Sequence, residues 1–271
     1  MSRFELGRNM ARREIAVMVV TAALFIVPVN AVAATTDTCY EGIYVSSVVW
    51  SYDVCGMPDI DQKRAGLPGN GQNYCLPTAT LNTMFWFDKT GYPNLLDGSY
   101  DPTSSEPYHY NEVTAKLSRM GGLADTDPLK GTNRNDNLDA INDLIESKGY
   151  ENDFDVSWES LDEEDNVSQR IVQLSRGAED LMIASIGWYD SDGDRTGGHA
   201  VTVVGAYGHA NGLHGIKFHD PANDANLTTQ SPTAIANYRL GNDNGDGSEV
   251  IGYGSSTITA RLEGVTVIST G

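Results

Sequence analysis

The residue best placed for covalent chemistry is a cysteine at the start of a predicted helix. Cys75 follows the glycine-rich loop 69–71, and Pro77 suits the first helical turn, where proline has no N–H to lose. Leu81 and Phe85 continue at helical spacing and indicate a buried face. The positive end of the helix dipole favours thiolate over thiol, so Cys75 is a candidate nucleophile. A buried structural cysteine is the alternative that this stretch alone leaves open.

An imidazole and a carboxylate lie near the ends of two later apolar stretches. His199 opens the first, residues 199–207, and Asp220 follows the second, residues 214–219. The turn-forming residues 208–213 join the two stretches, which predicts an antiparallel hairpin. In a hairpin centred near 209–210, residues whose numbers sum to about 419 face each other, with Cβ atoms about 5 Å apart. His199 and Asp220 satisfy that sum.

A carboxylate beside an imidazole can fix the ring's tautomer and orientation, as the third member of a catalytic triad does. We therefore expect Asp220 to orient the ring of His199. Asn223 is a weaker candidate for the orienting role because it lies beyond Pro221, off the predicted strand.

The chain begins with the three parts of a secretory signal. Four arginines lie in residues 1–13, an apolar run spans 15–27, and Ala31-Val32-Ala33 forms a cleavage motif. We expect cleavage after Ala33 and a secreted or periplasmic protein. The remaining chain would carry 14 basic and 35 acidic residues, a net charge of −21. Such a surface disfavours nucleic acid and anionic membranes as partners.

Three cysteines in an oxidising compartment leave either one free thiol or one intermolecular disulfide. Cys39 and Cys55 both precede the glycine-rich loop and can close a short ring, which would leave Cys75 free. The competing pairing is Cys55 with Cys75.

The order of elements indicates an α+β fold. Residues 34–65 are predicted to be an N-terminal arm with one or two strands, ahead of a single domain over 66–271. Helices are predicted first and antiparallel strands afterwards. The expected helices are 75–89, 111–120, 135–148 and one opened by a capping box at 160–163 and running to 176; the expected strands are 181–188, 199–207, 214–219, 235–240, 250–253 and 257–268.

The motifs at Cys75, at Gly198-His199-Ala200-Val201 and at Asp220-Pro221, in that order, resemble papain-like cysteine peptidases. The resemblance is closest to the branch of bacteriocin-leader-processing peptidases and their secreted relatives. It implies a papain-like fold, with the Cys helix among N-terminal helices packed on a C-terminal antiparallel sheet. It also implies a thiol protease in which Cys75 is the nucleophile, His199 the general base and Asp220 the orienting carboxylate.

The chain departs from that family at the oxyanion hole. The family places a glutamine five or six residues before the cysteine, where this chain has Gly69 and Asn70. Gln72 is our first candidate for the side-chain donor, with Asn70 and Asn73 as rivals. The backbone N–H of Cys75 would be the second donor.

Neither a cofactor nor a metal is expected. Calcium binding by the acidic loops 190–194 and 242–247 is the open alternative, although both lack the downstream glutamate of an EF-hand loop. From the resemblance, the predicted function is a secreted cysteine peptidase that acts on peptide or amide bonds of a peptide or protein substrate. An acyltransferase or transpeptidase with the same triad, and an inactive binding domain of the same fold, are the alternatives.

Overall fold

A computed structural model describes residues 41–162, 164, 166–175, 180–222, 227–230, 234–243 and 247–271. The predicted signal peptide, residues 1–33, lies outside the described residues. Four α-helices are described: α1 (Cys75–Thr90), α2 (Pro107–Leu123), α3 (Arg134–Ser147) and α4 (Val167–Leu174). Nine strands are described: β1 (Gly42–Val45), β2 (Val49–Asp53), β3 (Phe154–Ser160), β4 (Leu181–Tyr189), β5 (Arg195–His209), β6 (Leu213–His219), β7 (Ala236–Asp243), β8 (Ser248–Ser255) and β9 (Ile258–Thr270).

Six of the strands form a closed antiparallel barrel. They pair in the order β5-β4-β9-β8-β7-β6, and β6 pairs back with β5 to complete the ring. The other three strands extend the barrel: β3 pairs with β9, while β2 pairs with β5 and carries β1 at its outer edge. Register shifts interrupt β5–β6, β7–β8 and β8–β9. Such irregularities bend strands strongly enough to close a barrel.

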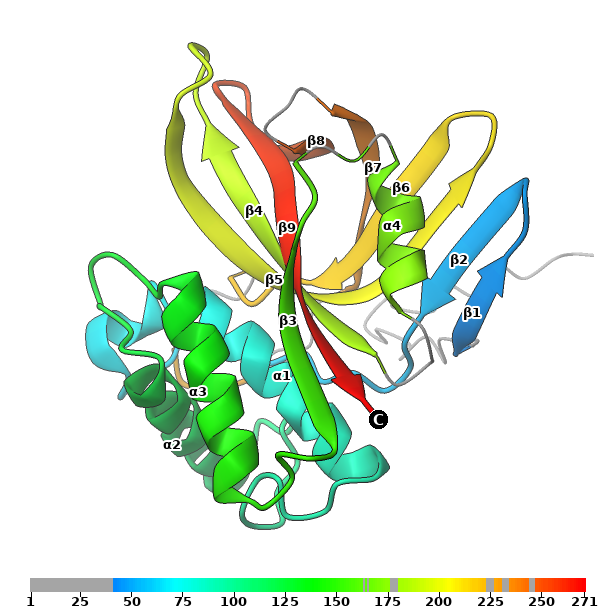
Figure 1. Cartoon of the computed structure of the whole chain (residues 1–271). Coiled ribbons are helices and arrows are strands. Elements are labelled where there is room, and N and C mark those ends of the chain that lie inside the picture. The colour runs from blue at the N-terminus through cyan, green and yellow to red at the C-terminus, as the bar shows by residue number, and fades with distance from the viewer. Residues whose placement is uncertain are drawn as a thin grey trace, which may run out of the picture. The chain divides into compact units, whose positions relative to one another are not determined.

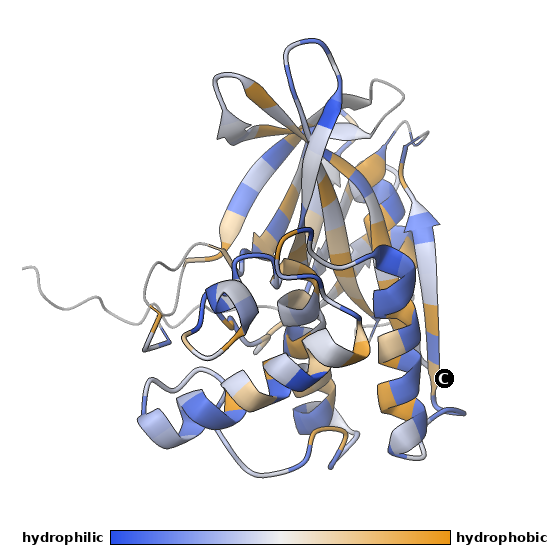
Figure 2. Cartoon of the chain, turned by 90° about the vertical axis from the view of Figure 1, so that its left-hand side faces the viewer, coloured by the Kyte–Doolittle hydropathy of each residue, from blue (hydrophilic) through white to orange (hydrophobic). Residues whose placement is uncertain are grey.

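The helices pack outside this barrel in two places (Figure 1). Helices α1, α2 and α3 gather beside one another, with α1 against β5 and β4. Helix α4 lies elsewhere, against β5, β2 and β6. Hydrophobic and hydrophilic residues alternate along the strands and occupy opposite sides of the helices (Figure 2), so that the apolar sides pack into one connected core.

The predicted papain-like α+β fold is wrong. The described chain is mostly β, and its antiparallel strands close into a barrel instead of forming a sheet that helices cover. Each of the six predicted strands is present, so the local pattern was interpreted correctly. Closure depends on the pairing of β6 with both β5 and β7, a non-local contact that alternation of apolar residues cannot reveal.

Two local predictions also need correction. The expected capping box at 160–163 does not open a helix, because Ser160 ends strand β3. Helix α4 starts at Val167 instead, and its N-cap is Asn166, whose side chain accepts a hydrogen bond from the Gln169 N–H. Strand β3 was not predicted at all.

The described part of the predicted arm belongs to the same unit as the rest. Residues 39–271 form one compact unit, in which β2 pairs with β5 from Val49↔His209 to Asp53↔Gly205. Among the described helices, none has the length and apolarity needed to cross a membrane.

Candidate active site

A left-handed turn delivers the chain to Cys75. Gly69, Asn70 and Gly71 all have positive φ, in the short 3₁₀ segment Pro68–Gly71. At Gly71 an added Cβ would lie 1.8 Å from the Gln62 carbonyl oxygen, so only glycine fits. Gln62 in turn donates from Nε2 to the Gln72 carbonyl at 2.8 Å. Contacts with Gln62 thus fix the conformation of the turn. Helix α1 begins at Cys75, as predicted.

Buried polar contacts fix α1 against the barrel. The Asn82 side chain donates from Nδ2 to Thr202 Oγ1 on β5 at 3.0 Å and accepts from the Ile60 N–H at 3.1 Å. Asn82 and Thr202 are both fully buried, so neither group has water as a substitute partner. Because Thr202 lies three residues after His199 on the same strand, this contact sets the position of the Cys75 helix relative to the imidazole.

His199 and Asp220 meet, although not as directly opposed residues. His199 Nε2 lies 2.8 Å from Asp220 Oδ1. The register of β5 and β6 pairs Thr202 with His219, a sum of 421, so the predicted sum of 419 is wrong. The backbone pairing of β5 and β6 ends at Thr202 and His219, and the side chains of His199 and Asp220 meet beyond that end. The predicted contact between imidazole and carboxylate is confirmed; the derivation from register is not.

Three donors surround the Asp220 carboxylate. His199 and the Ala222 N–H both reach Oδ1, the latter at 2.9 Å, and the Tyr253 hydroxyl donates to Oδ2 at 2.7 Å. Only 4% of the Asp220 side chain is exposed. Tyr253 comes from β8 and was missed by the sequence analysis, which assigned it only to a strand. Its position between two glycines, Gly252 and Gly254, was the available signal of a special site.

Aromatic rings pack against His199 and against Tyr253, the two side chains that hydrogen-bond to Asp220. Trp188 stacks on His199 with ring planes 19° apart and centroids 6.1 Å apart. Trp188 also contacts Tyr253, which packs against Phe218 and Tyr238 as well. The imidazole and the tyrosine therefore have little freedom to rotate away from Asp220.

The pKa values favour an ion pair between Cys75 and His199. Burial alone would raise the pKa of Cys75, but a hydrogen bond and the charge of His199 outweigh it and lower the pKa below its ordinary value. Burial alone would lower the pKa of His199, but the hydrogen bonds with Asp220 and Cys75 raise it to about 9. Burial of Asp220 opposes its ionisation, yet bonds from His199 and Tyr253 hold its pKa below the usual range. Between the two displaced pKa values, thiolate and imidazolium coexist.

Backbone donors also face the sulfur. The N–H groups of Ala200 and Leu76 both hydrogen-bond to Cys75 and contribute to its lowered pKa. The N–H of Cys75 itself makes no hydrogen bond to a carbonyl among the described backbone groups. At the first residue of α1, this N–H is free to stabilise an oxyanion.

Of the three candidate side-chain donors for an oxyanion hole, Asn73 lines the pocket beside Cys75, whereas Gln72 and Asn70 do not. Gln72 is exposed and does not line the pocket at Cys75, so the structure does not bring its amide to the site. Asn70, a rival candidate, is also exposed and outside the lining. Asn73 does line the pocket; its Nδ2 donates to the Pro128 carbonyl at 2.7 Å, which leaves one amide hydrogen.

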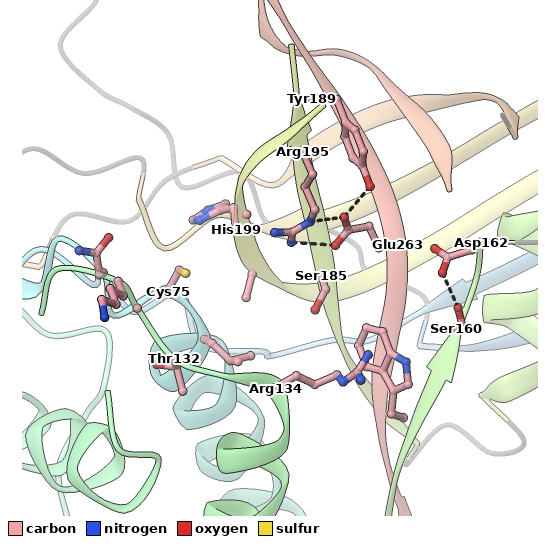
Figure 3. Close-up of a pocket in the computed structure, with 17 residues that line it drawn as sticks. Cys75, Thr132, Arg134, Ser160, Asp162, Ser185, Tyr189, Arg195, His199 and Glu263 are labelled. Atoms are coloured by element: carbon pink, nitrogen blue, oxygen red, sulfur yellow. Dashed lines mark hydrogen bonds and ion pairs between the residues drawn. The ribbon is translucent and has the colours of Figure 1, made fainter. Parts of the chain in front are cut away.

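Cys75 and His199 border a pocket of about 430 Å³ (Figure 3). Its walls come from the start of α1, from residues 130–134, and from strands β3, β4, β5 and β9. Cys75 and His199 lie at one side of it, and Arg195 and Glu263 face them from the barrel strands (Figure 3). A substrate held in this pocket would present a carbonyl group to the sulfur.

The structure also bears on the pairing of the cysteines. Cys75 is a free thiol and Cys55 is disulfide-bonded, so the competing Cys55–Cys75 pairing is wrong; Cys39 lies outside the described residues. Asn223 also lies outside them. Among the residues that the structure describes, no three potential ligands gather as a metal site would require.

Comparisons with known proteins add no assignment. No protein-family model matches the chain, and no curated protein sequence matches it. The resemblance to papain-like cysteine peptidases therefore remains a prediction from three short motifs.

Proposed function

We propose that this protein is a cysteine hydrolase that cleaves peptide or amide bonds, with Cys75 as nucleophile, His199 as general base and acid, and Asp220 as the orienting carboxylate. One observation carries the proposal: His199 is held between Asp220, 2.8 Å from its Nε2, and the free thiol of Cys75. A structural cysteine needs no such partner, and a buried imidazole in a binding domain needs no second contact to a thiol.

The reaction follows from this arrangement. The Cys75 thiolate attacks the carbonyl carbon of the amide, and the negative charge that develops on oxygen is stabilised by the Cys75 N–H. When the C–N bond breaks, the imidazolium of His199 gives its proton to the leaving amine, and a thioester to Cys75 remains. Neutral His199 then takes a proton from water as the water attacks the thioester, which releases the carboxylic acid product and restores the thiolate–imidazolium pair.

Asp220 keeps its charge throughout this cycle. Its role is to hold the imidazole with Nε2 towards the carboxylate, which leaves Nδ1 for the sulfur, and to stabilise the imidazolium form. Burial and three donors suit it to that role, because an ionised carboxylate with few waters needs fixed hydrogen bonds.

The test is hydrolysis of a pool of internally quenched peptides by the wild-type protein and by Cys75→Ala. We expect cleavage by the wild type and a loss of at least about 10⁴-fold in the variant. Mass spectrometry of an acid-quenched reaction should find the acyl group on Cys75. If the variant cleaves as fast as the wild type, or if no peptide in the pool is cleaved, the proposal fails.

The same reaction with an added amine separates hydrolysis from acyl transfer. A hydrolase gives the free carboxylic acid as its main product when glycinamide is present at millimolar concentration. An acyltransferase or transpeptidase would give mostly the new amide, because the amine replaces water in the second step.

A further inference from the structure

The pocket beside Cys75 carries charge of the opposite sign to the rest of the protein. The whole chain has 18 basic and 37 acidic residues. The pocket lining contains three basic residues, Lys130, Arg134 and Arg195, and only two acidic ones, Asp162 and Glu263. A local excess of basic side chains in so acidic a protein points to a ligand with negative charge.

One of the three cations is neutralised within the wall. Arg195 makes a two-point ion pair with Glu263, from Nε to Oε1 at 2.6 Å and from Nη2 to Oε2 at 3.0 Å (Figure 3). The Tyr189 hydroxyl also donates to Glu263 Oε1 at 2.8 Å. Both carboxylate oxygens of Glu263 thus accept hydrogen bonds from neighbouring side chains. The Nε and Nη2 donors of Arg195 are both engaged by that carboxylate. This pair contributes rigidity to the wall and little net charge.

Arg134 is held differently. Its guanidinium lies over the indole of Trp158, 4.3 Å from the ring centroid, and no carboxylate of the described residues lies within ion-pair distance of it. Stacking on an aromatic face orients the guanidinium but leaves its in-plane N–H donors free. Arg134 is therefore a positioned cation whose fork has no partner in this wall.

Lys130 adds a second charge to the same pocket. It is exposed, and no ion pair joins its ammonium to a described carboxylate. Asp162, the remaining acidic residue of the lining, accepts a hydrogen bond from Ser160 Oγ at 2.8 Å and is not paired with either cation. With Arg195 and Glu263 cancelled, two cations face one carboxylate.

We propose that Arg134, assisted by Lys130, binds a carboxylate of the substrate, so that the protein acts on peptides with an acidic side chain or a free terminal carboxylate near the scissile bond. This inference rests on the proposed function, because it concerns the substrate of the same thiol. A planar guanidinium matches a carboxylate with two parallel hydrogen bonds, and the stacking on Trp158 has already restricted its rotation.

Reactive peptides that alkylate Cys75 test the inference without a known substrate. Iodoacetyl-Glu-amide carries a side-chain carboxylate, iodoacetyl-Gln carries a free terminal one, and iodoacetyl-Gln-amide is the neutral twin of both. Their second-order rate constants are measured on the full protein at low ionic strength, for wild type, for Arg134→Gln/Lys130→Gln, and for Lys89→Gln. Lys89 is exposed near the far end of α1, so its variant changes net charge outside the pocket.

We expect at least one acidic probe to react about tenfold faster than the neutral twin in the wild type and in Lys89→Gln, and no faster in the double variant. Preference for iodoacetyl-Glu-amide would identify a side-chain subsite, and preference for iodoacetyl-Gln a terminal one. Equal rates for all three probes in the wild type, or a preference that survives in the double variant, would overturn the inference.

The neutral probe keeps this result separate from the proposed function. Its rate depends on the thiolate of Cys75 and on His199, and on neither cation. Rapid reaction at neutral pH with no preference for charge would refute the carboxylate subsite alone. Slow reaction with the neutral probe, confined to alkaline pH, would refute the reactive Cys–His pair whatever the charge preference.

Discussion

The two halves of the candidate site are held in different ways. The His199–Asp220 half is built into the barrel: the carboxylate accepts three hydrogen bonds, and aromatic rings confine both the imidazole and the hydroxyl of Tyr253. The Cys75 half lies at the start of a helix that is docked on the barrel from outside, with its position set by the turn 69–71 and the Asn82–Thr202 bond. The acid–base half is therefore intrinsic to the sheet, whereas the nucleophile depends on docking.

This difference separates what each half should tolerate. A change in the barrel half should alter the chemistry of His199 without moving Cys75. A change at the turn should move Cys75 and leave the imidazole and carboxylate paired. Three substitutions test this separation, in order of decreasing expected effect.

Asp220→Asn should have the largest effect. The amide removes the charge that stabilises imidazolium, and its N–H₂ group replaces one of the two acceptor oxygens, so the donors at that oxygen lose their acceptor. We expect peptide hydrolysis to fall about 10³-fold while the fold is kept. The matched control is Asp155→Asn, the same change at an exposed position of β3, which should leave the rate unchanged. Equal rates for Asp220→Asn and the control would contradict the assigned role.

Gly71→Ala should disrupt the Cys75 half. Its Cβ would lie 1.8 Å from a backbone oxygen at a φ of +74°, so the turn must shift. We expect a loss of about 2–4 kcal/mol in the free energy of unfolding, measured by urea denaturation, and slower alkylation of Cys75. Gly122→Ala is the control, because that helical position has open space around it and should be neutral or slightly stabilising. Wild-type stability in Gly71→Ala would refute the requirement for glycine.

Tyr253→Phe should have the smallest effect. It removes one of the bonds that keep the pKa of Asp220 low, so that pKa rises and Asp220 is protonated at a higher pH. We expect about a tenfold fall in hydrolysis and an acid limb of the pH–rate profile displaced to higher pH. A uniform fall at every pH, with the limb in place, would assign Tyr253 a purely structural role.

Local features of the site could be predicted from the sequence, and non-local ones could not. Cys75 at a helix start is encoded by its own neighbours, and the ends of α1 and α3 fall within one or two residues of the prediction. Paired residues of β5 and β6 sum to 422 beside the turn instead of the predicted 419, because the hairpin is centred near residue 211, and the shift between Val203 and Gly205 lowers that sum to 421. Turn composition specifies neither the centre nor the shift.

Other features were encoded but missed. Phe154, Val156 and Trp158 alternate with polar residues, which is the signal of strand β3. Closure of the barrel, the bond from Tyr253 to Asp220, and the gathering of Lys130 and Arg134 beside Cys75 all join segments that are distant in the chain. No periodicity in a single sequence reports such contacts.

The pH dependence of iodoacetamide alkylation at Cys75 tests the central claim, the thiolate–imidazolium pair, most directly. The pair requires pH above the lowered pKa of Cys75 and below that of His199, at about 9, so the wild type should react rapidly on a plateau through neutral pH. In His199→Ala the imidazolium no longer lowers the pKa of Cys75, so burial of the thiol raises that pKa unopposed. Alkylation should then begin only near the ordinary thiol pKa of about 8.5 or above it. A single transition near that value in both proteins would contradict the pair.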